Sequence, residues 1–329
     1  MDGERYRAAE QRLWASLGVE PTERQLRLRH LATDVRIQEV GDGQPVVFVH
    51  GANTSGSSWA SIASRLPTFR CILVDRPGTG LSPPPPTPID AATLPAFAEH
   101  LIVDVLDALD LSSAHVVGTS FGGYVALRSA AAHPDRVDRL ILFSWSAGLP
   151  VDRLPLFMRL MTMPGIGRIA TALPQTERSI RQVFRGLGHA EALADGRITR
   201  EDIGAILALY RDTDTMRNEL TMGRALVTAR GGLRMSLPDA LLGSIRTPTY
   251  LLWGEDDPFG GPDLARAAAG RLPNATLELL RGAGHAPWLD DLERCVEVIE
   301  KFLGLSDPPR PASPTPGRAT GDPSPSSVP

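Results

Sequence analysis

The alternation of apolar and polar positions predicts two antiparallel strands near the start of the chain. Residues 24–30 and 33–40 alternate apolar and polar side chains, as strands with one buried face do. Residues 45–49, Pro-Val-Val-Phe-Val, are instead almost continuously apolar, which is typical of a strand covered on both faces. The chain therefore enters a buried sheet early.

Helix-like and strand-like patterns alternate along the rest of the chain, with one long interruption. Further strands are expected at 71–74, 114–117, 140–143, 249–253 and 275–280, and helices at 57–66, 94–109, 124–132, 263–272 and 291–303. Such alternation predicts a parallel sheet with crossover helices. Between about residues 149 and 245 it stops, and helix-like sequence rich in Met and Arg follows. We expect an α/β fold: a mostly parallel central sheet flanked by helices, with an inserted helical cap.

This pattern divides the chain into four regions. Residues 1–23 form an N-terminal extension with a helix, because Tyr6, Leu13 and Trp14 have helical spacing. Residues 24–148 and 246–305 form the core, and residues 149–245 form the cap. The last 24 residues, 306–329, contain eight prolines and little that a core could bury. That composition predicts a disordered tail.

Composition and charge disfavour several classes of partner. The chain is 42% hydrophobic and 22% charged with a net charge of −4, so it has no electrostatic bias toward nucleic acid or anionic membranes. The N-terminal stretch lacks the apolar core of a signal peptide, and no run approaches the length of a membrane span. We therefore expect a cytoplasmic protein that binds neither nucleic acid nor membranes. Cys71 and Cys295 are too few for a disulfide framework and are expected to be buried thiols.

Ser120 is the candidate nucleophile. It lies in the run Gly118-Thr-Ser-Phe-Gly122, between an apolar strand and an Ala-rich helix. A sharp strand-to-helix turn strains the backbone at the serine and leaves no room for side chains two residues away on either side. The glycines at 118 and 122 meet that demand. The Gly-x-Ser-x-Gly pattern alone is common. Its position between a predicted strand and a predicted helix is what indicates a nucleophile.

A serine hydroxyl is a weak nucleophile, so it needs a base, an acid that orients the base, and donors for the oxyanion. His285 follows the last predicted strand in a Gly-rich loop and is the best base. The acid is expected among Glu255, Asp256 and Asp257, which follow the strand at 249–253, and these three adjacent carboxylates leave the choice open.

Two backbone N–H groups are expected to bind the oxyanion. One belongs to Phe121, the residue after the nucleophile, and the other to Ala52, in the loop His50-Gly-Ala-Asn53 after the strand at 45–49. Several other side chains are candidates for the lining of an acyl pocket, although Met and Trp at such spacings more often belong to a core: Asn53, Trp145, Met161, Met163 and Trp288. The remaining histidines, His189 among them, are expected at solvated or core positions.

The ordered landmarks resemble those of the α/β-hydrolase fold family, and the match spans residues 24–305. They are His50-Gly51, Asp75-Arg-Pro-Gly-Thr-Gly-Leu-Ser82, the turn at 118–122, Trp253-Gly-Glu-Asp-Asp257 and Gly284-His285. In that family the acid of a Gly-x-x-Asp segment is the Asp three residues after the Gly, which corresponds to Asp257. The resemblance thus implies a triad of Ser120, Asp257 and His285.

The family resemblance implies hydrolysis, and the identity of the nucleophile limits which bonds the protein could cleave. A nucleophilic serine disfavours epoxide hydrolysis and dehalogenation, because attack on an alkyl carbon would leave a dead-end ether. We expect cleavage of a small hydrophobic ester, thioester or lactone. Carbon–carbon bond hydrolysis, acyl transfer or perhydrolysis with the same triad, and a non-catalytic binding protein are the alternatives. No cluster has metal-ligand spacing and no second glycine fingerprint precedes a helix, so neither metal nor cofactor is expected.

Overall fold

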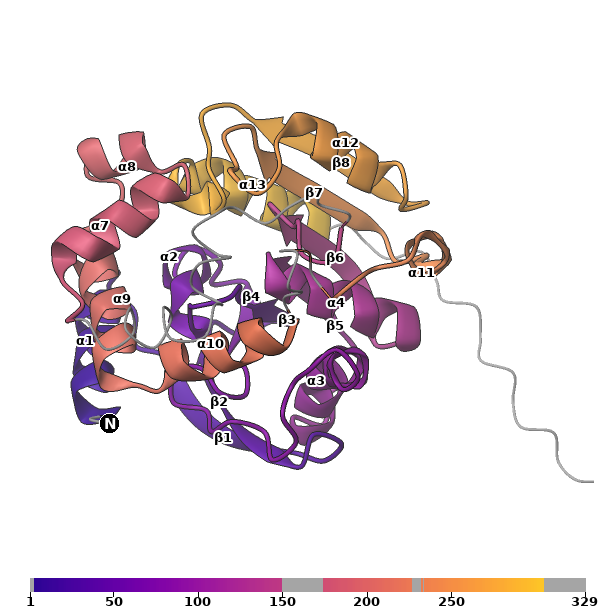
Figure 1. Cartoon of the computed structure of the whole chain (residues 1–329), viewed down its shortest axis with the longest axis horizontal. Coiled ribbons are helices and arrows are strands. Elements are labelled where there is room, and N and C mark those ends of the chain that lie inside the picture. Colours follow the sequence, from indigo (N-terminus) through magenta and orange to yellow (C-terminus); the bar gives the residue numbers. More distant parts are fainter. Residues whose placement is uncertain (1–2, 150–173, 227–231, 233, 305–329) are drawn as a thin grey trace, which may run out of the picture.

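A computed structural model of the chain describes residues 3–149, 174–226, 232 and 234–304. An eight-stranded sheet runs through these residues in the order β1-β2-β4-β3-β5-β6-β7-β8 (Figure 1). The strands are β1 (Thr22–Leu28), β2 (Thr33–Val40), β3 (Gln44–Val49), β4 (Phe69–Val74), β5 (Ala114–Thr119), β6 (Val137–Phe143), β7 (Thr249–Gly254) and β8 (Ala275–Leu280). β2 pairs antiparallel with β1 and β4, and all other neighbours are parallel. The expected α/β architecture is confirmed.

Helices cover both faces of the sheet. One face packs against α3 (Leu94–Ala108), α4 (Phe121–Ala132), α11 (Asp239–Ser244) and α12 (Pro262–Ala269), and the other packs against α2 (Ala60–Ala63) and α13 (Leu292–Leu303). Alternate residues of a strand divide between the two clusters, as the pleat requires: Val47 lies in the first cluster and Phe48 in the second. The double covering explains why the central strands are continuously apolar.

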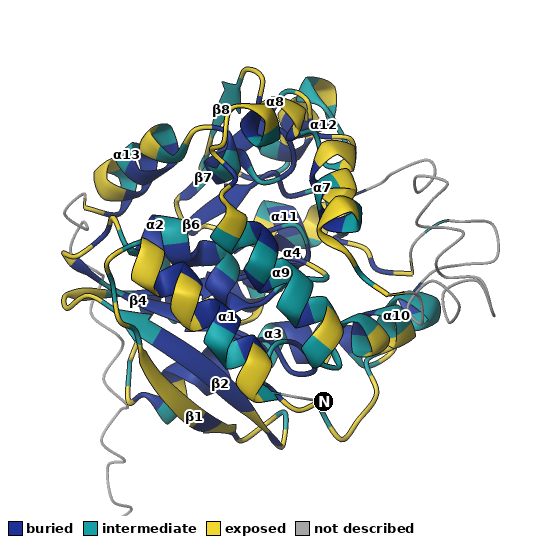
Figure 2. Cartoon of the chain, turned by 90° about the vertical axis from the view of Figure 1, so that its left-hand side faces the viewer, coloured by how far each residue is buried: buried dark blue, intermediate teal, exposed yellow. Residues whose placement is uncertain are grey.

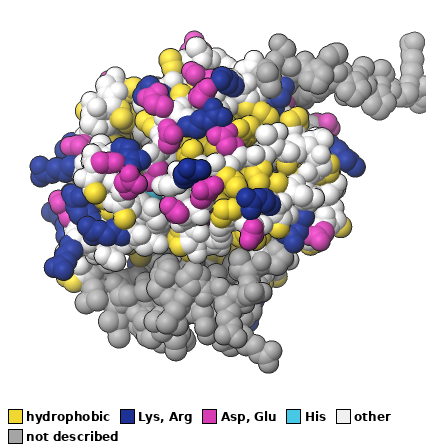
Figure 3. All heavy atoms as spheres, turned by 90° about the horizontal axis from the view of Figure 1, so that it is seen from above, with side chains coloured by type: hydrophobic (Ala, Val, Ile, Leu, Met, Phe, Trp, Pro, Cys, Tyr) yellow, Lys and Arg dark blue, Asp and Glu magenta, His cyan; other side chains and the backbone are white. Residues whose placement is uncertain are grey.

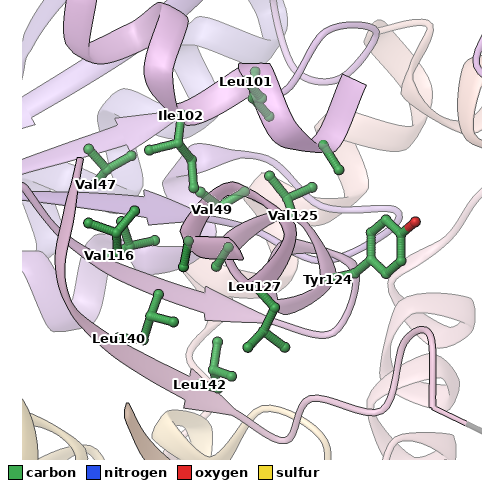
Figure 4. Close-up of a cluster of buried hydrophobic side chains, with 14 of the residues drawn as sticks. Val47, Val49, Leu101, Ile102, Val116, Tyr124, Val125, Leu127, Leu140 and Leu142 are labelled. Atoms are coloured by element: carbon green, nitrogen blue, oxygen red, sulfur yellow. The ribbon is translucent and has the colours of Figure 1, made fainter. Parts of the chain in front are cut away.

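The core beneath α3 and α4 shows this packing directly (Figure 4). Leu101 and Ile102 from α3 and Val125 from α4 lie among side chains of β3, β5 and β6, including Val116. Each of these four side chains is at most 1% exposed. Burial of one such side chain stabilises the fold by about 1.5–3 kcal/mol, so this layer holds the strand ends in place.

Besides α11, the described residues between β6 and β7 form the helices α7 (Glu177–Gly186), α8 (Ala190–Ala194), α9 (Arg200–Asp212) and α10 (Thr215–Leu226). Figure 1 shows α7, α8 and α9 along the left-hand side of the molecule and α10 extending from there toward its centre. α7 and α9 each begin with a capping box, formed by Thr176 with Ser179 and by Thr199 with Asp202. The helices bury a small cluster of their own, which includes Ile180. The insertion is thus helical, as the sequence predicted, where it is described.

The N-terminal helix α1 (Gly3–Ser16) packs against α9 of the insertion, and Figure 2 shows the two side by side. Tyr6 is fully buried, and its hydroxyl donates to Ser55 Oγ at 2.7 Å. Glu10 accepts from the buried guanidinium of Arg36 at 2.7 Å. Sequence reasoning found no role for α1, and these contacts show that it joins the insertion to the core.

Some predicted boundaries were wrong. β1 ends at Leu28, two residues early, because the chain turns through Ala32 with φ 49° and Asp104 accepts from the backbone N–H groups of His30 and Leu31. The helix expected at 57–66 is a short 3₁₀ turn, η1 (Gly56–Trp59), followed by α2. The expected disordered tail at 306–329 lies outside the described residues.

No helix in the described ranges is long and apolar enough to span a bilayer. The face that carries α12 and α13 has Lys and Arg interspersed with Asp and Glu (Figure 3). This mixture agrees with the small net charge of −4.

Candidate active site

Ser120 occupies the turn between β5 and α4. Its backbone has φ 51° and ψ −119°, which is strained for a residue other than glycine. A Cβ at Gly118 would lie 2.9 Å from the Gly122 carbonyl oxygen, and one at Gly122 would lie 2.0 Å from the carbonyl oxygen of Val49. The turn therefore closes on itself and against the end of β3. Only glycine fits at these two positions, for the reason that the sequence suggested.

His285 and Asp257 meet across two loops. His285 follows β8 and Asp257 follows β7, and His285 Nδ1 lies 2.9 Å from Asp257 Oδ2. The other carboxylate oxygen of Asp257 accepts from the Phe259 N–H at 2.9 Å. Asp257 is buried, whereas Asp256 is exposed and Glu255 is half-buried. Among the three adjacent carboxylates, Asp257 is thus the one that contacts the imidazole.

A chain of contacts connects the serine turn to the histidine loop through β6. Thr119 Oγ1 donates to the Phe143 carbonyl at 2.8 Å. The next residue, Ser144, accepts from the Gly254 N–H at 3.0 Å and faces the Gly284 carbonyl at 3.4 Å. The loops after β5, β6, β7 and β8 therefore contact one another in series. This places Ser120, Asp257 and His285 at the same edge of the sheet, where the carboxyl ends of parallel strands meet.

A second buried His–Asp pair holds the backbone around His285. His189 Nδ1 lies 2.7 Å from Asp290 Oδ2, and that oxygen also accepts from the Gly284 N–H at 2.9 Å. His189 Nε2 accepts from the Ala286 N–H at 3.2 Å. Because a backbone N–H donates to Nε2, this nitrogen is an acceptor, and Nδ1 is the nitrogen that donates to Asp290. The His285 N–H itself donates to the Leu187 carbonyl at 2.9 Å.

Sequence reasoning missed this pair. His189 was expected at an unremarked solvated or core position, and it is indeed fully buried, but it contacts the loop of the candidate base. His189 comes from the α7–α8 connection and Asp290 lies 101 residues later. No local pattern joins residues so far apart, so only the fold could show the contact.

The loop that carries Ala52 lies beside Ser120, since a Cβ at Gly51 would be 3.1 Å from Ser120 Cβ. Arg76, which is fully buried, donates to the Gly51 carbonyl at 2.9 Å and to Glu219 Oε1 at 2.9 Å. Glu219 belongs to α10 and its other oxygen accepts from the Asn53 N–H at 3.3 Å. Sequence reasoning missed Arg76 and Glu219, although Arg76 lies within a landmark segment directly after β4.

His50, the first residue of that loop, is fully buried. Its Nε2 accepts from the Arg76 N–H at 3.2 Å, and its Nδ1 lies 2.8 Å from the Gly51 carbonyl oxygen. Burial, and secondarily the charge of Arg76, lower the pKa of His50 well below its usual value near 6.5. His50 is therefore neutral at neutral pH and acts as a fixed donor to Gly51.

Two of the side chains named as candidates for pocket lining, Trp145 and Trp288, have other surroundings. Trp145 is fully buried and donates to the Ala147 carbonyl at 2.7 Å, and Trp288 stacks on Trp59 with ring centroids 4.3 Å apart. Both are core residues. Met161 and Met163 lie outside the described residues. Two hollows of about 480 and 520 Å³ open beside α1 and β2, and none of their lining residues is Ser120, Asp257 or His285.

Comparison with known proteins agrees with this geometry. A family model described as the alpha/beta hydrolase fold matches residues 44–292. Pimeloyl-[acyl-carrier protein] methyl ester esterase from Chromobacterium violaceum is 33% identical over 81% of this chain and 97% of its own. A 2-hydroxy-6-oxononadienedioate/2-hydroxy-6-oxononatrienedioate hydrolase from Cupriavidus pinatubonensis is 26% identical over 86% of this chain and 96% of its own.

Solved structures show the same fold. Naproxen esterase (carboxylesterase NP) from Bacillus subtilis superimposes with a TM-score of 0.72 at 19% identity, covering 92% of this chain and 99% of that one. The family match covers most of the sheet and every loop of the candidate site. The chain therefore belongs to the α/β-hydrolase fold family, and it is a hydrolase of that fold.

Proposed function

We propose that this protein is a serine hydrolase that cleaves a small hydrophobic carboxylic ester, thioester or lactone through an acyl-enzyme on Ser120. The observation that carries the proposal is the 2.9 Å contact between buried Asp257 and His285, at the same sheet edge as the strained turn of Ser120. A carboxylate on Nδ1 leaves Nε2 of His285 free to accept a proton, which is the tautomer that a general base requires.

The proposed reaction runs in two halves. His285 takes the proton of Ser120 Oγ as the oxygen attacks the substrate carbonyl, and the N–H groups of Phe121 and Ala52 stabilise the oxyanion. His285 then protonates the leaving alcohol or thiol. Water attacks the acyl-enzyme with His285 again as base, and the acid and free Ser120 are released. Phe121 is the first residue of α4, so its N–H has no carbonyl partner within the helix.

Residues 149–245 are proposed to form a cap over this site. Two contacts support that role: Glu219 of α10 holds the Asn53 N–H, and the α7–α8 connection contacts the backbone at 285 and 286. An insertion that contacts these loops would select the acyl group, as loops do on other scaffolds.

Ester cleavage is preferred to carbon–carbon bond cleavage. The esterase relative shares 33% identity, against 26% for the 2-hydroxy-6-oxononadienedioate hydrolase. In addition, the charge of Arg76 beside the site is already offset by Glu219 at 2.9 Å, which suits a neutral substrate better than a carboxylate. Carbon–carbon hydrolysis remains the second candidate because that relative covers 86% of the chain.

Labelling by a fluorophosphonate serine probe tests the proposal, with Ser120→Ala as control. Labelling that is lost in the variant, together with turnover of p-nitrophenyl esters, would support an activated serine, and a chain-length series would then measure the acyl pocket. Failure of the folded wild-type protein both to react with small fluorophosphonates and to turn over esters would contradict it and favour a binding protein on the same fold.

A further inference from the structure

The Gly51 carbonyl is surrounded by hydrogen-bond donors. Arg76 Nη2 lies 2.9 Å from its oxygen, Thr54 Oγ1 lies 3.1 Å away and His50 Nδ1 lies 2.8 Å away. A carbonyl oxygen has two lone pairs, so three donors saturate it and fix its direction. This carbonyl shares a peptide group with the Ala52 N–H.

A trans peptide directs its C=O and N–H to opposite sides. The three donors therefore hold the Ala52 N–H pointing away from Arg76, His50 and Thr54. Within the described part of the chain this N–H donates to no other group, and Ala52 itself is exposed. Polarisation of the carbonyl by a cation also makes the N–H of the same peptide a stronger donor.

Arg76 contacts the second proposed oxyanion donor as well. Its guanidinium lies 4.7 Å from the centre of the Phe121 ring, and its Nε donates to the His50 carbonyl at 3.2 Å. One planar cation thus touches both loops that supply an N–H to the oxyanion. Glu219 holds this cation at 2.9 Å and also accepts from the Asn53 N–H, so the next peptide of the loop is fixed too.

We propose that Arg76, held by Glu219 of the insertion, is a positioning residue for the oxyanion hole: it orients the Gly51–Ala52 peptide and packs on Phe121. This inference rests on the proposed function and extends it. It also means that the insertion contributes to the hydrolytic step through α10, not only through substrate contacts. The burial of an Arg–Glu pair is weak evidence of stability by itself, because desolvation offsets the attraction, so a positional role accounts for it better.

Arg76→Lys tests the proposal while it keeps the positive charge beside Glu219. A lysine ammonium lacks the planar fork that reaches the His50 and Gly51 carbonyls together and cannot stack in the same way on Phe121. We expect kcat for a p-nitrophenyl ester to fall about 10- to 100-fold, with KM changed less than about threefold, since the oxyanion exists only after attack. Affinity for an alkylboronic acid, which forms a tetrahedral serine adduct, should fall by the same factor as kcat/KM.

Thr54→Val provides a second test, because Thr54 is only half-buried and the fold should tolerate the change. It removes one donor to the Gly51 carbonyl and should lower kcat severalfold, whereas Thr54→Ser, which keeps the hydroxyl, should restore it. Asp104→Asn is the matched control: it alters a buried carboxylate on α3 that accepts hydrogen bonds from the His30 and Leu31 N–H groups, between β1 and β2. It should lower Tm with kcat unchanged.

The outcomes separate this inference from the function on which it rests. Wild-type turnover with kcat losses in Arg76→Lys and Thr54→Val, matched by losses of boronic acid affinity, supports it. Wild-type turnover with both folded variants within twofold of wild type overturns the inference alone. If Arg76→Lys does not fold, the comparison of Thr54→Val with Thr54→Ser tests the inference. A wild-type protein with neither ester turnover nor fluorophosphonate labelling overturns both.

Discussion

His285 Nδ1 lies 2.9 Å from Asp257 Oδ2, and Asp257 Oδ1 accepts a hydrogen bond from the Phe259 N–H. Both oxygens of the carboxylate therefore make hydrogen-bond contacts. The Phe259 N–H, from the same loop, holds the carboxylate in the orientation in which it contacts the imidazole. Asp256, its neighbour, is exposed. The proposed acid and the residue next to it thus differ sharply in environment, which makes them a matched pair for mutation.

Asp257→Asn should lower kcat for a p-nitrophenyl ester by about 10⁴-fold, because an amide at this position favours the wrong tautomer of His285. Asp256→Asn should stay within about twofold of wild type. Steady-state kinetics at pH 7.5, corrected by active-site titration, compare the two. A larger loss in Asp256→Asn than in Asp257→Asn would overturn the assignment of the acid.

His189→Phe should lower kcat about tenfold, because it removes the acceptor of the Ala286 N–H and the donor to Asp290 and so releases the backbone beside His285. His189→Gln, whose side-chain oxygen can reach the same N–H, should recover most of the activity. Rates of fluorophosphonate labelling should follow kcat in both variants. Full activity in a folded His189→Phe protein would show that this pair does not position the base.

The protonation of His50 should make stability depend on pH. Its pKa is lowered well below 6.5 in the folded protein, first by burial and then by the charge of Arg76, whereas the unfolded chain takes up a proton on this residue near pH 6.5. The unfolded state then binds more protons, so the free energy of unfolding falls as pH falls below about 6.5, by up to about 1.4 kcal/mol per pH unit from this group.

Urea unfolding between pH 7.5 and 5 measures this contribution as the difference between wild type and His50→Gln, which does not titrate there. The variant should lose stability less steeply with acid, whatever its stability at pH 7.5. Parallel curves for the two proteins would refute the prediction, because every other titrating group is common to both.

Gly122→Ala should destabilise the protein by about 3 kcal/mol or more, because the new Cβ would lie 2.0 Å from the backbone oxygen of Val49, which cannot move without shifting β3. Gly204→Ala in α9 is the control. No atom outside its own helix lies within 4 Å of the added Cβ, so this change should stabilise the protein by about 0.5–1 kcal/mol. Denaturant titrations measure the free energy of unfolding of both variants. A loss well below about 3 kcal/mol in Gly122→Ala would contradict the prediction and show that the turn can open.

Most of the fold could be predicted from the sequence because its strands are covered on both faces. β3 and β5 are nearly continuous apolar runs, and the predicted ends of both strands lie within two residues of those observed. Boundaries failed where tertiary contacts decide them: the end of β1 depends on Asp104, which is more than seventy residues away in the sequence.

The candidate site was predictable only in part, because some of its residues lie in recognisable local segments and others are joined only by tertiary contacts. Ser120, Asp257 and His285 each follow a strand in a short segment with its own glycines, so local spacing marks them. Sequence alone left three carboxylates open, and burial distinguishes Asp257. Arg76, Glu219, His189 and Asp290 form contacts across 101 and 143 residues, and no periodicity encodes such partners.

The insertion of this protein is not a separable module. Glu219 and His189 accept hydrogen bonds from the backbone of the two loops that flank the proposed reaction. A chimaera in which a foreign insertion replaces residues 149–245 would lose the partner of Arg76 and the acceptor of the Ala286 N–H together. Replacement of the insertion in this scaffold therefore requires grafts that retain positions 189 and 219, or a simultaneous redesign of residues 76 and 290.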